Sequence, residues 1–235
     1  MSVIKYNSEL FDILKDLTAI NTQIIIEKGP EGEVVVSRAD TESTIAYRLT
    51  APSNYFDFDT SEKIAFYNYP EFYQYFKALG EPDISINQKD IRLDAGSSKS
   101  NYLLSNPESI QPGPKAINFI SGDVKMNLSS DDLDELLKMI GLINSKKAQI
   151  TGNGKNITIK IFNNLHDNTF EKTFEVENIN GDDGVEIDFV MFSDTFKNLP
   201  PKKDYVIEIK AQGFIKISLV DENIGLDIYT GRVKK

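Results

Sequence analysis

The chain carries one helix-like segment twice, and this duplication constrains its fold more than any other feature. LFDILKDLTAIN at 10–21 aligns with LDELLKMIGLIN at 133–144. The identities share an offset of 123 and pair Leu10 with Leu133, Leu14 with Leu137, Lys15 with Lys138, Ile20 with Ile143, and Asn21 with Asn144. A second segment keeps the same offset, because Ile64 aligns with Ile187 and Phe66 with Phe189. The sequence therefore predicts an internal repeat of slightly more than half the chain.

Each half has the same order of predicted elements: helix, strands, helix, strands. In 8–21 the apolar residues follow the i, i+3, i+4, i+7 spacing of an amphipathic helix, and the copy at 133–143 does the same. Ser129 is a plausible N-cap for that copy, since the acids of SSDDLDE then fall in the first turn, where the helix dipole favours negative charge. This capping chemistry favours a helix start over a metal-binding cluster.

Second helices are predicted at 69–80 and 192–201. In YPEFYQYFKALG, Pro70 suits a first helical turn and Gly80 suits a helix end. In FSDTFKNLPP, Ser193 is the expected N-cap and Pro200 ends the helix.

Alternating apolar residues predict strands around these helices, as in Ile45-Tyr47-Leu49 and in 157–161. The TGNGKN segment at 151–156 joins two such strands. It lacks the spacing of a phosphate-binding loop, so it predicts a hairpin turn.

Composition excludes most catalytic systems and indicates no export or membrane segment. The 235 residues include no cysteine and a single histidine, His166, which is expected in a solvated polar loop. No apolar run is long enough to cross a membrane, and no secretory signal precedes the first helix. We therefore expect a cytoplasmic protein, in the host cytoplasm if viral, that is not an enzyme and holds neither metal nor cofactor. A net charge of −10 argues against nucleic acid only if the charge is spread evenly.

A proline- and glycine-rich stretch separates the two halves. The predicted organisation is a first domain at 1–106, a connecting linker at 107–124 and a second domain at 125–235. The predicted fold class is α+β, with two tandem β-rich domains that each carry two helices on one face of antiparallel sheets.

This order and spacing resemble the DNA polymerase sliding clamps over essentially the whole chain. Two units per chain resemble the clamps that close as trimers, as in eukaryotes (PCNA), archaea and T4-like phages. The small size and irregular loops look most similar to the phage type. The resemblance implies a homotrimeric ring around double-stranded DNA, without sequence readout, that tethers DNA polymerase and is placed by a clamp loader.

The resemblance also implies three sets of site residues. The helices of such clamps line the central hole, so the expected DNA contacts are Lys15, Lys77, Lys138, Lys197, Lys146, Lys147 and Gln74. Edge strands close the ring, and the candidates near 99–105 and 169–178 are Tyr102, Leu104, Phe170, Phe174 and Val176. Partner peptides dock beneath the linker, at Ile45, Ile117, Phe119, Tyr229, Arg232 and Val233.

Each set has a plainer reading. The lysines are also compatible with ordinary solvated surface, and the edge-strand residues with the core of their own domain. Phe119 either lines a peptide pocket or plugs back into its domain. Two other functions stay open: a β-rich adaptor without DNA, and a monomeric processivity factor with an open basic face.

Overall fold

The structure is a computed structural model that describes residues 3–59, 63–87, 89–114, 117–163, 166–179 and 185–233, with main chain only at 166 and 167. The chain divides into two compact units, Met1–Lys115 with Asp221–Leu226 and Ala116–Val220 with Asp227–Lys235. Residues 107–114 of the predicted linker therefore group with the first unit and 117–124 with the second.

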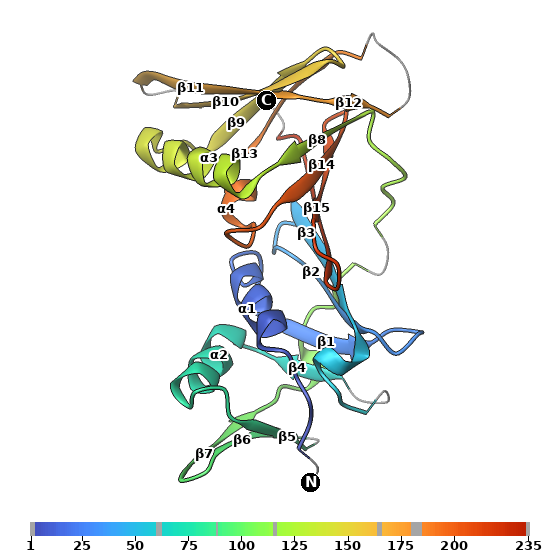
Figure 1. Ribbon diagram of the computed structural model, residues 1–235, viewed down its shortest axis with the longest axis vertical. Coiled ribbons are helices and arrows are strands. Elements are labelled where there is room, and N and C mark those ends of the chain that lie inside the picture. Colours follow the sequence, from blue (N-terminus) through green and yellow to red (C-terminus); the bar gives the residue numbers. More distant parts are fainter. Residues whose placement is uncertain are drawn as a thin grey trace. The chain divides into compact units, whose positions relative to one another are not determined.

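The first unit is built from antiparallel strands and two ten-residue helices (Figure 1). Its helices and strands are α1 (Ser8–Leu17), β1 (Ile24–Lys28), β2 (Val34–Ala39), β3 (Ile45–Ala51), β4 (Ile64–Phe66), α2 (Tyr69–Ala78), β5 (Asp83–Ile86), β6 (Asp90–Ala95) and β7 (Ser98–Leu103), with one-turn 3-10 helices η1 (Ser53–Tyr55) and η2 (Pro107–Ser109). The strands run β4-β1-β2-β3 in one sheet and β5-β6-β7 in another.

Aromatic side chains fill the first unit where α1 and α2 pack beside the strands. The Phe11 ring lies 5.0 Å from Phe76, 5.3 Å from Phe56 and 5.9 Å from Phe72, centroid to centroid, in edge-to-face arrangements. This geometry is favourable because the positive ring edge meets the negative ring face. The cluster fixes both helices on the same side of the strands (Figure 1).

The second unit repeats this plan with longer strands. Its elements are β8 (Val124–Leu128), α3 (Ser130–Ile143), β9 (Lys147–Gly152), β10 (Asn156–Asn163), β11 (His166–Glu175), β12 (Glu177–Asn178), β13 (Ile187–Phe192), α4 (Asp194–Lys197), β14 (Tyr205–Lys210), β15 (Phe214–Leu219) and β16 (Gly225–Gly231). One sheet has the order β12-β8-β14-β15-β16 and the other β11-β10-β9-β13.

The core of the second unit is aliphatic, in contrast to that of the first. Side chains from both sheets and from α4 meet in this core and leave a cavity of only about 10 Å³. The residues that line it are Met126, Ile150, Ile159, Met191, Phe196, Ile207, Ile209, Ile215 and Ile217. Such tight apolar packing is what the alternating strand pattern requires. The predicted α+β class with two helices per unit on antiparallel sheets is confirmed.

Several local predictions are confirmed with their expected chemistry. Ser129 caps α3 in a capping box, accepting from the Asp132 backbone N–H while the Asp132 carboxylate accepts from that of Ser129. Pro70 lies in the first turn of α2, and Gly80 follows the helix at φ +71°. The TGNGKN segment is a hairpin turn between β9 and β10.

The second helix of the second half is much shorter than predicted. α4 is a single turn, Asp194–Lys197. Ser193 holds its N-cap position as predicted, but the Ser193 side chain makes no capping hydrogen bond. The Ser193 hydroxyl is fully buried and donates to the Ser145 carbonyl at 2.7 Å. Since Phe196 and Leu199 are buried and prolines follow at once, the chain is pinned to the core before a second turn forms.

Two other boundaries differ from the sequence prediction. α1 ends at Leu17 rather than at 21, because the Thr18 hydroxyl donates to the Lys15 carbonyl and tightens the last turn. His166 begins β11 rather than lying in a loop, and its side chain is outside the described residues.

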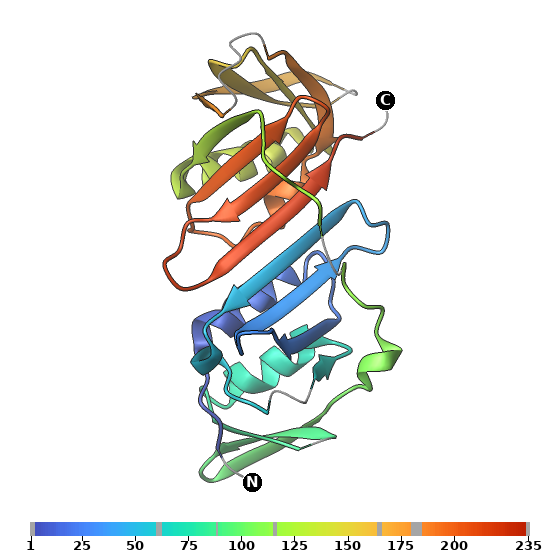
Figure 2. The same ribbon diagram turned by 90° about the vertical axis from the view of Figure 1, so that its right-hand side faces the viewer.

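The first half of the linker, 107–114, runs alongside the first unit (Figure 2). A buried arginine that was not among the predicted residues anchors it there. Arg38 is 1% exposed, and its guanidinium donates to the Gln111 carbonyl. The Ser37 hydroxyl donates to the Pro114 carbonyl at 3.0 Å, and Gly113 lies so close to the Ser37 carbonyl that no Cβ fits. Residues 107–114 of the linker are therefore held against the first unit by hydrogen bonds and close packing.

Candidate functional site

The lysines predicted to contact DNA differ in exposure and in their partners. Lys15, in the last turn of α1, and Lys147, at the start of β9, are half-buried. The others are exposed, as is Gln74 on α2: Lys77, Lys138, Lys146 and Lys197. Lys197 is paired with Asp194 at 2.8 Å.

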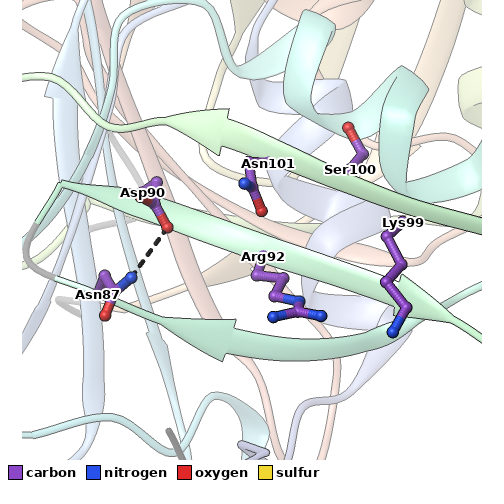
Figure 3. A pocket seen from close by; sticks show the side chains of 6 residues that line it. All are labelled: Asn87, Asp90, Arg92, Lys99, Ser100 and Asn101. Carbon is purple, nitrogen blue, oxygen red and sulfur yellow. Dashed lines mark hydrogen bonds between the residues drawn. The ribbon is translucent and has the colours of Figure 1, made fainter.

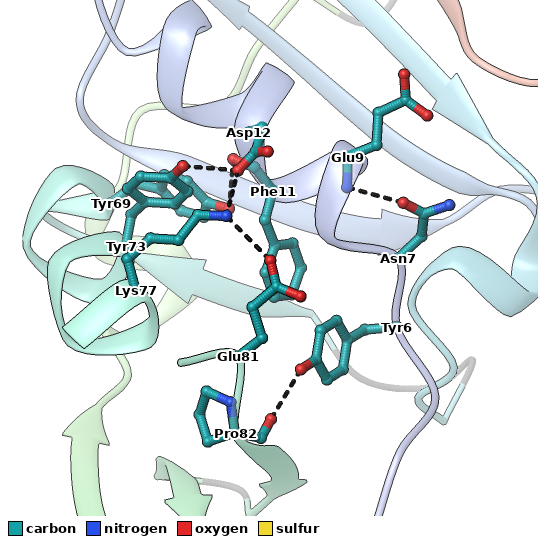
Figure 4. Close-up of polar contacts among 10 residues, drawn as sticks. All are labelled: Tyr6, Asn7, Glu9, Phe11, Asp12, Tyr69, Tyr73, Lys77, Glu81 and Pro82. Atoms are coloured by element: carbon teal, nitrogen blue, oxygen red, sulfur yellow. Dashed lines mark hydrogen bonds and ion pairs between the residues drawn. The ribbon is translucent and has the colours of Figure 1, made fainter. Parts of the chain in front are cut away.

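Lys77 is the most constrained of these lysines (Figure 4). Its ammonium lies 3.0 Å from a carboxylate oxygen of Asp12 and 3.1 Å from one of Glu81. The Tyr73 hydroxyl donates to the same Asp12 oxygen at 2.6 Å. Partial burial disfavours the charged lysine, but hydrogen bonds to Asp12 and Glu81 outweigh that effect and raise its pKa. Partial burial and the bond to Asp12 raise the pKa of Tyr73 to about 12.

The helices carry more acid than base. The four α-helices contain nine carboxylates and four lysines. On α3, the exposed surface presents Asp131, Asp134 and Glu135 beside Lys138. These helices would attract phosphate only weakly, because each lysine shares its surroundings with carboxylates.

Both strands predicted to close a ring lie at sheet edges. β7 is the last strand of β5-β6-β7, and β11 is the first of β11-β10-β9-β13. An edge strand presents backbone N–H and C=O groups that another chain can pair with.

The side chains predicted for this interface are only partly available. Tyr102 is 9% exposed, and its ring centroid lies 5.5 Å from that of Phe72. Phe174 is 8% exposed, so both side chains are largely buried in their own units. Leu104, Phe170 and Val176 are half-buried. Leu103, which the sequence analysis passed over, is 76% exposed at the end of β7. Leu103 and Leu104 are adjacent leucines, so residue type alone does not show which of them is exposed. Only the alternation of side chains along the strand distinguishes them.

A shallow polar pocket of about 300 Å³ lies on β5-β6-β7 (Figure 3). Its lining residues are Asn87, Asp90, Arg92, Lys99, Ser100 and Asn101. Asp94 lies 3.0 Å from the Lys99 ammonium and 3.5 Å from the Arg92 guanidinium. Asp90 in the lining is a second carboxylate, so the two cations and two carboxylates sum to zero charge and give the pocket little pull on a free anion.

The predicted partner pocket is assembled in part within the second unit. The Phe119 ring lies 6.2 Å from that of Tyr229, and the Lys210 ammonium lies 5.3 Å from the Phe119 ring centroid. Phe119 stays half-buried, so it both plugs back toward β16 and presents apolar surface. Ile120 beside it is 93% exposed, which the sequence analysis did not anticipate.

The remaining pocket candidates are spread along the chain. Ile117 is half-buried, Arg232 is exposed, and the Val233 backbone N–H donates to the Val190 carbonyl at 2.7 Å. Ile45 is 6% exposed and belongs to the first unit, at the start of β3. Its role in a partner pocket stays a prediction.

Within the described part of the chain, no three His, Cys, Asp or Glu side chains are grouped so that they could hold a metal ion. None of the described helices has the length and apolarity to cross a membrane.

Comparison with known proteins identifies the fold. No family model matches the chain, and no curated protein matches it in sequence. Among solved structures, that of A. fulgidus PCNA bound to the C-terminal region of FEN-1 superimposes with a TM-score of 0.77 at 11% identity, covering 100% of this chain and 99% of that one. The chain has the PCNA sliding-clamp fold.

Two further PCNA structures agree with this assignment. Proliferating cellular nuclear antigen from Entamoeba histolytica gives a TM-score of 0.74 at 11% identity, with 96% of this chain and 95% of that one covered. The PCNA2–PCNA3 complex from Sulfolobus tokodaii gives 0.73 at 15% identity, with 99% of each chain covered. The sliding-clamp fold thus accounts for both units and the linker, and the predicted resemblance in fold is confirmed.

Proposed function

We propose that the chain is a DNA polymerase sliding clamp, a non-enzymatic processivity factor that encircles duplex DNA. The observation that carries this proposal is the sliding-clamp fold along the entire chain, with an unpaired edge strand in each unit. Three copies close a ring when β7 of one copy pairs with β11 of the next, through Tyr102, Leu103 and Leu104 on one side and Phe170, Phe174 and Val176 on the other.

The ring holds DNA by topology, so its phosphate contacts are loose and independent of sequence. The proposed contacts are the helix lysines Lys15, Lys77, Lys138 and Lys197, together with Lys146, Lys147 and Gln74. The nine helix carboxylates keep this lining weakly attractive.

Replication proteins dock as short peptides on the surface formed by Ile117, Phe119, Tyr229, Arg232 and Val233, with Ile45 as a further candidate. The similar A. fulgidus PCNA binds the C-terminal region of FEN-1, which gives a precedent for such a peptide partner. DNA polymerase and a clamp loader are the partners proposed here, and a T4-like phage source would place the protein in the host cytoplasm.

The test combines mass and topology. Light scattering after size exclusion should give three chains per particle. Clamp loaded on nicked circular DNA should stay bound at a salt concentration that abolishes direct binding, and linearising the circle should release it. A monomer that leaves circular and linear DNA equally fast would contradict the proposal.

A second candidate is a β-rich adaptor that does not encircle DNA. The excess of helix carboxylates favours it, because a DNA-lining surface is expected to be basic. Retention on the circle, lost on linearisation, separates the ring from the adaptor and from a monomeric open-face processivity factor.

A further inference from the structure

The ion network around Lys77 joins three parts of the first unit. Asp12 comes from α1, Lys77 from the last turn of α2, and Glu81 from the turn that follows (Figure 4). Tyr73, one turn before Lys77 on α2, donates to the same Asp12 oxygen. Two carboxylates thus hold the lysine ammonium, and the Tyr73 hydroxyl holds one of those carboxylates in place.

In the second unit, a carboxylate at the repeat-equivalent position of the first helix is also paired with a lysine. The offset of 123 relates Asp12 of α1 to Glu135 of α3. Glu135 pairs with Lys172 of β11, which also lies 2.6 Å from Asp132, the repeat equivalent of Glu9. The lysine therefore comes from a different element in each unit, while the carboxylate keeps its place on the first helix.

A phosphate group and a carboxylate offer a lysine the same kind of partner. Exposed ion pairs contribute little stability in water, so a phosphate brought close can displace them. Each displacement nevertheless leaves one carboxylate without its cation and closer to the DNA charge. The net attraction between the lysine and DNA is therefore reduced by whatever holds that lysine beforehand.

We propose that Asp12 and Glu81 compete with DNA phosphate for Lys77 and so keep the contact of α1 and α2 with the duplex weak. This inference rests on the proposed sliding-clamp function. The raised pKa of Lys77 agrees with it, because the lysine stays charged and its availability is set by its partners rather than by protonation. Asp12 and Glu81 are positioning residues here, since they act through Lys77.

The test uses charge-neutral variants that keep side-chain shape. Asp12→Asn with Glu81→Gln removes both competitors, and Lys77→Ala is made in the wild-type and in the doubly substituted background. Glu31→Gln with Glu108→Gln is the matched control, because these two acids are exposed in a strand-connecting turn and in the linker and change the net charge equally. Glu81→Gln alone is a milder variant that leaves the bond between Tyr73 and Asp12 in place.

Binding to a linear duplex and retention on circular DNA are both measured against salt. Each additional lysine–phosphate contact steepens the slope of log K against log salt by about 0.9, or about 3- to 4-fold in affinity between about 50 and 200 mM salt. We expect the Asp12→Asn, Glu81→Gln variant to steepen the slope by about 1 to 3 for a ring with three copies of Lys77. The control should change affinity without this increment.

Lys77→Ala should abolish the increment. An increment that persists in the Lys77→Ala background, or that the control reproduces, would overturn the inference. Failure of the proposed clamp function can be told apart from failure of this inference. If the protein does not encircle DNA, wild type and every variant would leave circular and linear DNA equally fast. The salt slopes on linear duplex would still show whether Asp12 and Glu81 reduce the contact of Lys77 with phosphate.

Discussion

Replacing Leu103 with serine should weaken the association of subunits while leaving each subunit folded. Leu103 ends the edge strand β7 and is 76% exposed in the single chain. It makes little contact within its own unit, so its loss should hardly change the free energy of unfolding of the monomer. Pairing of β7 with β11 of another copy would cover it.

The size of the effect follows from the exposed fraction. Burying a whole leucine side chain contributes about 1.5–3 kcal/mol. Three-quarters of that is about 1–2 kcal/mol for each interface. Since about 1.4 kcal/mol is a factor of ten, the dissociation constant of one interface should rise about 5- to 30-fold.

The measurement is a dilution series followed by light scattering or sedimentation, which gives the concentration at which trimers dissociate. Val220→Ser is the matched control, because Val220 is also exposed, at 56%, but follows β15 rather than lying on a predicted interface strand. If Leu103→Ser and Val220→Ser dissociate at the same concentration as wild type, β7 is not the closing edge and the interface assignment fails.

Three further outcomes are expected. Ser129→Ala removes the α3 cap and should cost about 1 kcal/mol, lowering the melting temperature by about 2–4 °C in a calorimetric scan, whereas Ser130→Ala should not. Partial burial opposes ionisation of Asp132, but hydrogen bonds from Lys172 and Ser129 outweigh it and lower the pKa of Asp132. The stability that this adds is present above the unfolded pKa of about 4 and is lost as pH falls through the lower folded pKa. Asp132→Asn should therefore flatten the acid side of the stability–pH profile in denaturant titrations. Phe119→Ala with Tyr229→Ala should weaken binding of polymerase-tail peptides in titration calorimetry without changing the subunit count, and equal affinity would remove the proposed pocket.

Local sequence signals predicted the elements whose causes are local. The cap of α3 and the start of α2 depend on residues within one helical turn, so Ser129 and Pro70 could be assigned from spacing alone. The shared offset of 123 likewise allowed the order of helices and strands in the two halves to be predicted. The length of α4 could not be obtained this way, because the Ser193 hydroxyl is occupied by a carbonyl 48 residues away.

The candidate sites depended more on long-range contacts. Lys77 was predicted as a DNA contact, and this stays a prediction. Its pairing with Asp12 could not be predicted, because Asp12 lies on another helix and no sequence pattern joins the two residues. Arg38 was missed although a signal existed: it continues the alternation of Val34 and Val36 on the buried face of β2. A charged residue in such a register indicates a specific partner, here the Gln111 carbonyl.

The two units show which parts of the repeat tolerate change. Their cores are built differently, from aromatic rings around Phe11 in one and from aliphatic chains around Ile159 in the other. Cores accept such replacement when volume and pattern are kept, so divergence there leaves the backbone in place. Asp12 and Glu135 occupy the same repeat position, and both are carboxylates paired with a lysine. The lysine comes from α2 in the first unit and from β11 in the second. The repeat therefore keeps an acidic side chain at this surface position of the first helix, while the rest of the ion network differs between the units: Lys77 lies on a helix proposed to face DNA, and Lys172 lies on the strand proposed to close the ring.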